Sequence, residues 1–216
     1  MATRLTFVLA IALAVASGAR ESLATAATDP AGDFLPTYAG PKNGDMDVLS
    51  SDVVFHPAAN TFTFMATFNG PVNTTPGALY VWGVDRGTGT DLLTGATPPI
   101  GAGIVFDSVF IGVPDAGVGL VNLLDGSAAT TVPGLVVSGN SVSETVSASL
   151  FPTKGFMPSA YLWNLWPRSG SNSADNTQIS DFAPDNTVLP VTIPEPASLA
   201  LVAVGFGSLL AIRRRS

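Results

Sequence analysis

Six aspartates near the two ends of the central region are the residues best suited to bind a metal ion. Asn43, Asp45 and Asp47 alternate like the first ligands of a calcium loop, but the glycine is misplaced at Gly44 and no glutamate closes the loop, so an EF-hand is excluded. Calcium binds several carboxylate oxygens, and the ion relieves their mutual repulsion. We therefore expect a calcium site at the edge of the fold. Its candidate ligands are Asp29, Asp33, Asp45, Asp47, Asp181 and Asp185. The alternative is that these aspartates only cap turns through hydrogen bonds to the backbone.

Two tryptophans in the segment YLWNLW are candidates for binding a sugar ring. Residues alternate between the two faces of a strand, so Trp163 and Trp166 point to opposite sides. At most one of them can belong to the core between two sheets. A tryptophan on the other face could stack on a sugar, or both rings could be buried by the core and a loop.

Residues for nucleophilic or acid–base catalysis are few. His56 is the only histidine, and no G-x-S-x-G turn presents a serine to it. The chain has no cysteine, which excludes a thiolate metal site and a cysteine nucleophile. Asp107 and Glu144 are the carboxylates in the most apolar stretches, where a raised pKa would suit a glycoside hydrolase. A secreted hydrolase is the third functional hypothesis, and we expect no enzyme activity.

The central region is strongly acidic. Between Thr28 and Ile193 there are fourteen acids and four bases, so the net charge of this region is 4 − 14 = −10. A nucleic-acid backbone would be repelled, and we expect no nucleic-acid partner.

The pattern of the central region is that of β-structure. Residues 61–69 (TFTFMATFN) alternate apolar and polar side chains, and so do residues 140–150 apart from Glu144. Further strands are expected at 52–56, 78–85, 103–113, 117–124, 135–138 and 160–166, separated by clusters of Gly, Pro, Asn and Asp. About eight short strands predict an all-β fold, an antiparallel β-sandwich that is jelly-roll-like.

The N-terminus carries the pattern of a secretory signal. Arg4 precedes an apolar run at 7–16, and small residues follow, either Ser17 and Ala19 or Ala24 and Ala26, at the positions before a cleavage site. We expect an N-terminal signal helix within a signal peptide at 1–27.

The C-terminus carries a short apolar run and a basic end. Residues 197–212 form a predicted transmembrane helix, slightly shorter than the hydrocarbon core. Arg213, Arg214 and Arg215 place its end in the cytoplasm by the positive-inside rule. Before it, Pro194 and Pro196 keep the backbone extended and accessible to a processing enzyme.

The C-terminus contains, in this order, Pro194-Glu195-Pro196, a short apolar segment and an arginine cluster. This order closely resembles the PEP-CTERM sorting signal of exported bacterial proteins. The resemblance covers residues 192–216. It implies that an exosortase, a membrane-embedded transpeptidase, recognises the Pro-Glu-Pro motif, cuts near it and delivers the protein to the cell surface. It also implies a link to extracellular polysaccharide and biofilm. A lasting membrane anchor is the alternative.

Residues 29–70 loosely resemble the N-terminal part of extracellular carbohydrate-binding and DOMON-like β-sandwich modules, through Asp29, Asp33, Asp47 and the alternating strand that follows. The expected organisation is a signal peptide at 1–27, a β-sandwich at 28–190 and a sorting signal at 191–216. The expected function is that of an exported, non-enzymatic protein, tethered in the inner membrane before it reaches the cell surface or matrix. The alternative is a calcium-assisted carbohydrate-binding module.

Overall fold

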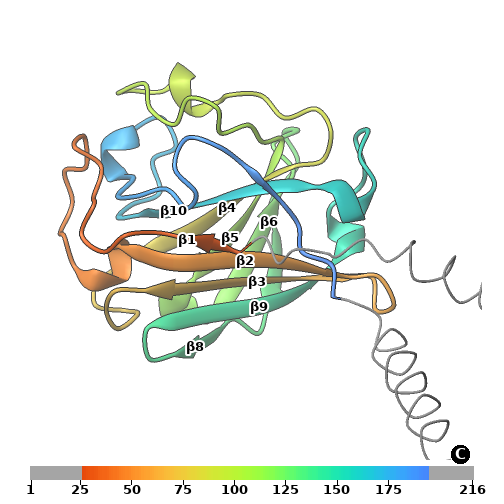
Figure 1. The fold of residues 1–216 in the computed structure, drawn as a ribbon, viewed down its shortest axis with the longest axis horizontal. Helices are drawn as coiled ribbons and strands as arrows, with labels where there is room; N and C mark the ends of the chain where they lie inside the picture. Colours follow the sequence, from red (N-terminus) through yellow and green to blue (C-terminus); the bar gives the residue numbers. More distant parts are fainter. Residues whose placement is uncertain (1–25, 195–216) are drawn as a thin grey trace, which may run out of the picture. The chain divides into compact units, whose positions relative to one another are not determined.

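Two antiparallel sheets make up the fold (Figure 1). The computed structural model describes residues 26–194. The strands in this range are β1 (Ala27–Thr28), β2 (Val48–His56), β3 (Thr61–Phe68), β4 (Leu79–Asp85), β5 (Ser108–Val113), β6 (Val118–Asn122), β7 (Thr130–Pro133), β8 (Val136–Ser138), β9 (Ser141–Ser147), β10 (Leu162–Arg168) and β11 (Leu189–Pro190). Their connections include six short 3-10 turns: η1 (Gly44–Met46), η2 (Leu93–Gly95), η3 (Pro114–Ala116), η4 (Ala148–Leu150), η5 (Pro158–Ala160) and η6 (Asn176–Gln178). The predicted all-β class and antiparallel sheets are confirmed.

The strand order differs from the predicted jelly roll. One sheet has the order β1-β2-β3-β9-β8 and the other β11-β10-β4-β5-β6-β7. Strands β4 to β7 therefore form a meander in one sheet, whereas a jelly roll is built from two Greek keys. The order resembles that of a variable-type immunoglobulin sandwich if β2, β3, β9 and β8 are strands A, B, E and D, and β11, β10, β4, β5 and β6 are strands G, F, C, C′ and C″. Here β1 and β7 each add one edge strand.

Two side chains strengthen this likeness. Trp82, on the strand equivalent to C, is fully buried in the core, where immunoglobulin domains place a tryptophan. Tyr161 precedes the strand equivalent to F, and its hydroxyl donates to the carbonyl of Phe151 at 2.9 Å, as in a tyrosine corner. The two hallmarks belong to the fold and carry no information on function.

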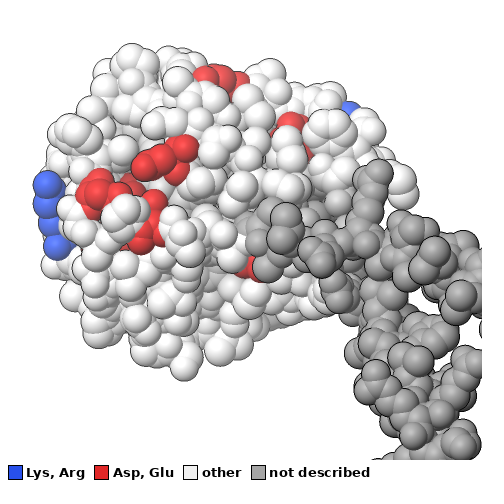
Figure 2. Space-filling model, in the orientation of Figure 1, with Lys and Arg blue, Asp and Glu red and all other residues white. Residues whose placement is uncertain are grey.

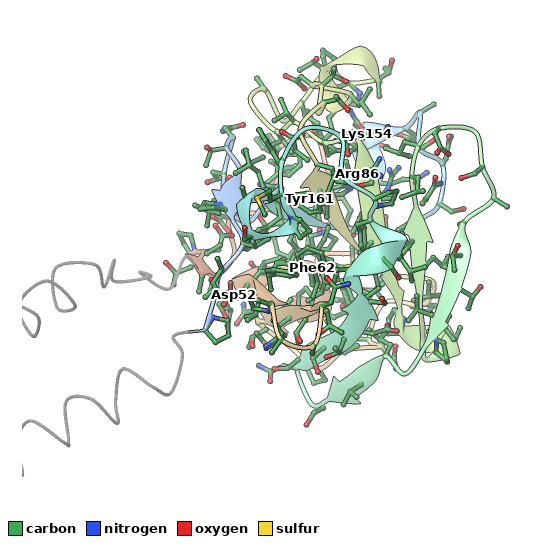
Figure 3. The ribbon with its side chains drawn as sticks, turned by 90° about the vertical axis from the view of Figure 1, so that its right-hand side faces the viewer. Asp52, Phe62, Arg86, Lys154 and Tyr161 are labelled. Carbon is green, nitrogen blue, oxygen red and sulfur yellow. The ribbon has the colours of Figure 1, made fainter. Side chains whose placement is uncertain are left out.

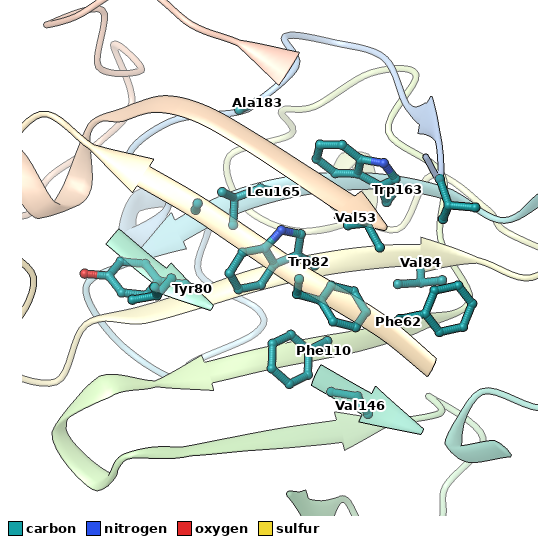
Figure 4. Close-up of a cluster of buried hydrophobic side chains, with 14 of the residues drawn as sticks. Val53, Phe62, Tyr80, Trp82, Val84, Phe110, Val146, Trp163, Leu165 and Ala183 are labelled. Carbon is teal, nitrogen blue, oxygen red and sulfur yellow. The ribbon is translucent and has the colours of Figure 1, made fainter. Parts of the chain in front are cut away.

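The core between the sheets is rich in aromatic rings (Figure 4). Strand β3 alternates as predicted, with Phe62, Phe64, Ala66 and Phe68 buried. Phe64 stacks on Phe110 of the opposite sheet at 4.4 Å between ring centroids, and the indole of Trp82 donates to Ser51 at 3.0 Å. Because aromatic rings bury large areas, these contacts stabilise a sandwich that has no disulfide.

One buried ion pair lies near the end of the sandwich where β4 finishes (Figure 3). Arg86 is fully buried, and its Nε donates to Asp107 at 2.7 Å. Its other nitrogens donate to the carbonyls of Pro152, Asp107 and Leu123. Burial favours the neutral acid, but hydrogen bonds from Arg86 and Thr88 and the charge of Arg86 hold the pKa of Asp107 below its usual value.

The domain extends slightly beyond its predicted bounds of 28–190. β1 begins at Ala27, and Thr192 pairs in parallel with Val54 of β2. Within residues 26–194, none of the helices has the length and hydropathy needed to cross a membrane. The predicted signal helix and the predicted helix at 197–212 lie outside the described residues.

Candidate calcium centre

Five of the six predicted aspartates come together where the first and last segments of the domain meet. Asp29 follows β1, and its backbone N–H donates to Leu49 of β2 at 2.9 Å. Asp33 lies on the following loop. Asp47 directly precedes β2, while Asp181 and Asp185 lie in the segment between β10 and β11. Figure 2 shows acidic side chains gathered on the side of the molecule where the segment after β1 lies.

Backbone contacts hold these two distant segments together. The N–H of Leu35 donates to Ser180 at 2.8 Å, and the N–H of Ala39 donates to Thr177 at 2.9 Å. The hydroxyl of Ser180 donates to the carbonyl of Met46. The carboxylates therefore converge because the loop after β1 is hydrogen-bonded to the segment that follows β10.

The carboxylates form two groups that share one residue. Asp29, Asp33 and Asp185 each offer an oxygen within 4.8 Å of the others, and so do Asp33, Asp47 and Asp181. Asp33 and Asp185 are exposed, whereas Asp47 and Asp181 are 1% and 2% exposed. The centre thus has a buried base and a solvent-facing rim, through which an ion can enter.

Two buried carboxylate oxygens of the centre accept no hydrogen bond. Asp47 Oδ2 accepts from the N–H of Gly32 at 2.8 Å and from the amide of Asn69 at 2.9 Å. Its Oδ1 is buried without a hydrogen-bond partner, and so is Oδ2 of Asp29. Buried polar atoms are nearly always partnered, so two orphaned carboxylate oxygens in one acidic group point to a missing cation.

The electrostatics of the centre favour protonation when no cation is present. Burial, followed by the charges of Asp181, Asp33 and Asp185, raises the pKa of Asp29. Burial also raises the pKa of Asp181, although backbone hydrogen bonds from Val48 and Phe182 oppose this effect. The pKa of Asp185 is raised by burial and by Asp33. A divalent cation would oppose these shifts, because its positive charge stabilises the ionised carboxylates.

Asp45 does not belong to this centre, contrary to the sequence-based expectation. Its two oxygens accept from the hydroxyl and the backbone N–H of Thr75, both at 2.7 Å. The side chain is fully buried and fixes the β3–β4 connection against η1. Asp45 lies within the 3-10 turn η1 and Asp47 directly after it, so only Asp47 lies beside Asp33 and Asp181.

The two tryptophans proposed for sugar binding do not form a platform. They do lie on opposite faces, because Trp163 packs between the sheets and Trp166 packs on the outer face of its sheet. However, Trp163 is 0% exposed and Trp166 is 2% exposed. Neither ring is exposed enough to serve as a platform for a sugar.

The remaining candidate catalytic groups lie apart from the aspartates. Asp107 is paired with Arg86, and His56 hydrogen-bonds Thr63 at 3.0 Å. Glu144 is buried in the sandwich, where both its oxygens lack a hydrogen-bond partner. Burial raises the pKa of Glu144 to about 7.

Sequence reasoning missed the groups that position the ligands. Gly32 and Asn69 hold Asp47, and the N–H of Val48 donates to Asp181 at 2.9 Å. None of these lies in a metal-binding motif, so the sequence contained no signal for them. No protein-family model matches the chain, and no match was found among curated proteins.

Proposed function

We propose that this chain is an exported, non-enzymatic β-sandwich protein of the cell surface, which binds calcium where the two ends of its domain meet. The observation that carries the proposal is the buried Asp47 Oδ1, which has no hydrogen-bond partner within a group of five aspartates. Oxygen-only ligands of this kind suit a hard cation. Calcium suits the centre better than magnesium, because it tolerates irregular geometry and more ligands.

The role of the ion is to stabilise the domain. It would bridge the loop after β1 to the segment between β10 and β11, so it would bind the folded state much more tightly than the unfolded chain. A ligand at about 100 times its Kd stabilises by roughly 2.7 kcal/mol. Extracellular calcium modules commonly have a Kd of about 10⁻⁴ to 10⁻³ M, which matches the compartment expected from the secretory signal.

Thermal unfolding of the purified full-length protein in calcium and in EGTA tests the calcium proposal. We expect calcium to raise the Tm by several degrees, in line with the size of the domain. Asp33→Asn should remove most of this rise because Asp33 belongs to both groups and is exposed. Asp125→Asn is the matched control, since Asp125 lies in an exposed turn and accepts from Ser127. An equal Tm in calcium and EGTA would contradict the proposal.

Export and sorting remain a proposal that rests on the termini. Cleavage after Ala26 would leave Ala27, the first residue of β1, at the new N-terminus. At the other end, the proposed Pro194-Glu195-Pro196 signal directly follows the segment that pairs with β2. Intact mass of the protein from the cell surface and medium tests this route. Wild type should begin at Ala27 and end near Pro194, and Glu195→Ala should stay in the membrane. Full-length wild type in the membrane would mean a lasting anchor.

Association with extracellular polysaccharide follows only from the resemblance of the sorting signal. A carbohydrate-binding module would share the calcium centre, but its proposed tryptophans are buried. The centre therefore supports a stabilising role for calcium more directly than a role in sugar recognition.

A further inference from the structure

An apolar cavity of about 490 Å³ lies on the outer face of the second sheet, away from the aspartates. Its floor is made by outward-facing side chains of β10, β4 and β5. These are Trp166, Leu79, Val81, Val109 and Ile111. Part of this apolar face packs under the covering segments, where Val81, Val109 and Trp166 form a second hydrophobic cluster with Phe106, Ile179 and Phe182. The volume falls within the range of small-molecule sites.

The cavity is supported by two covering segments that are hydrogen-bonded to each other. The amide of Asn176 donates to the carbonyls of Leu93 and Pro98, both at 2.8 Å, and the N–H of Asn176 donates to Thr97. The ring of Trp166 lies against Gly83, where a Cβ would come within 2.7 Å of the indole. Floor and wall are thus held in place without a ligand, as expected of a pre-formed site.

One buried cation lines the cavity. Arg168, at the end of β10, is 7% exposed. Among residues 26–194 the only ion pair joins Arg86 to Asp107, so no described carboxylate lies within ion-pair distance of Arg168. Its Nη2 donates to the carbonyls of Asn172 and Asp175, while its Nε is buried without a partner. Burial lowers the pKa of Arg168, an effect that the nearby charge of Asp175 opposes.

The polar groups around the apolar floor are all compatible with an anionic head group. Asn122, Ser171 and Ser173 line the cavity together with Arg168, and none of the lining residues is acidic. This is notable in a region with a net charge of −10. Leu92 and Leu124, which are 46% and 42% exposed, complete the apolar lining at its accessible edge. The guanidinium supplies a positive charge that attracts a carboxylate.

We propose that this cavity binds an aliphatic carboxylate, with the alkyl chain on the floor formed by β4 and β5 and the carboxylate at Arg168. The chain would lie against Ile111, Leu92 and Leu124 and remove their exposed surface from water. The head group would place a counter-charge within ion-pair distance of Arg168, which no carboxylate of residues 26–194 does. This site is independent of the calcium centre.

Calorimetric titration of the full-length protein with decanoate, decanol and decyltrimethylammonium tests the proposal. All three are used below the concentrations at which they aggregate. We expect decanoate to bind at least tenfold more tightly than decanol, and the cation to bind most weakly. Absence of decanoate binding, or equal affinity for decanoate and decanol, would overturn the proposal.

Two variants locate the site without disturbing Arg168. Leu92→Asp adds a negative charge at an exposed position of the lining, and Leu92→Asn is its uncharged match. Asp should weaken decanoate binding severalfold relative to Asn and leave decanol binding equal. A brominated decanoate should quench tryptophan fluorescence in the wild type, and Trp166→Phe should remove most of that quenching while binding heat persists. Unchanged quenching, or equal decanoate affinity in the two Leu92 variants, would place the ligand elsewhere.

Discussion

The pair of Arg86 and Asp107 and the calcium centre are both buried groups of charges, but only the pair is complete. In the pair, opposite charges meet at 2.7 Å and backbone carbonyls accept three further hydrogen bonds from the arginine. In the centre, five like charges converge and two buried oxygens have no partner. The pair therefore lowers the pKa of Asp107, whereas the centre raises the pKa of Asp29. A buried group of charges that lacks compensation from the protein is suited to compensation by an ion.

The largest loss of stability is expected at the ion pair of Arg86 and Asp107. Arg86→Met leaves Asp107 buried without its partner, which typically costs about 3 to 5 kcal/mol. Urea unfolding followed by fluorescence should report this loss. The double variant Arg86→Met with Asp107→Leu should recover a large part of it, because replacement of a whole buried pair by apolar residues is often neutral. A single variant as stable as the wild type would show that the pair does not stabilise the fold.

Removal of one charge from the calcium centre should have opposite effects with and without the ion. In EGTA, Asp29→Asn relieves repulsion, and we expect a gain of about 1 kcal/mol at pH 8. In calcium, the same variant should lose part of the stabilisation seen in the wild type. The gain in EGTA should grow as the pH rises from about 4. In the unfolded chain Asp29 ionises near this pH, whereas in the folded state its raised pKa opposes ionisation, so the wild type loses stability as the pH rises. Chemical unfolding across pH measures both effects, and a loss in EGTA would contradict the like-charge account.

Glu144 provides an intermediate case, a single buried carboxyl with neither a counter-charge nor neighbouring carboxylates. Burial raises its pKa from 4.5 to about 7, so its contribution to stability falls as the pH rises between these values. Glu144→Met should stabilise the protein by about 1 to 3 kcal/mol at pH 8 and by less at pH 5. Glu144→Gln separates the loss of charge from the loss of polarity. A gain independent of pH would show that the carboxyl is not the cause.

Only those features of the fold and of the calcium centre that depend on the local residue pattern could be predicted from the sequence. Strict alternation in β3 and β9 identified both strands, because each has one buried face. The alternation did not identify the order of the strands, since that depends on how distant segments pair. The short edge strands β1, β7 and β11 were missed because they lack a periodic pattern.

The same limit explains the errors at the candidate sites. Asp45 and Asp47 look equivalent in sequence, and only the position of Thr75, thirty residues later, separates them. Trp166 was assigned to one face of its strand correctly, but the loops that bury it could not be placed. Asp107 was singled out for its apolar surroundings, but its pairing with Arg86 could not be predicted because it requires β4 and β5 to be neighbours.

A crystal structure of the protein grown in calcium would show whether an ion lies among the aspartates. We expect an ion at the junction of the two groups, with carboxylate oxygens of Asp33, Asp47 and Asp181 among its ligands at about 2.3 to 2.6 Å. Anomalous scattering distinguishes this ion from water. A water molecule on Asp47 Oδ1, with no ion among the five aspartates at saturating calcium, would contradict the account.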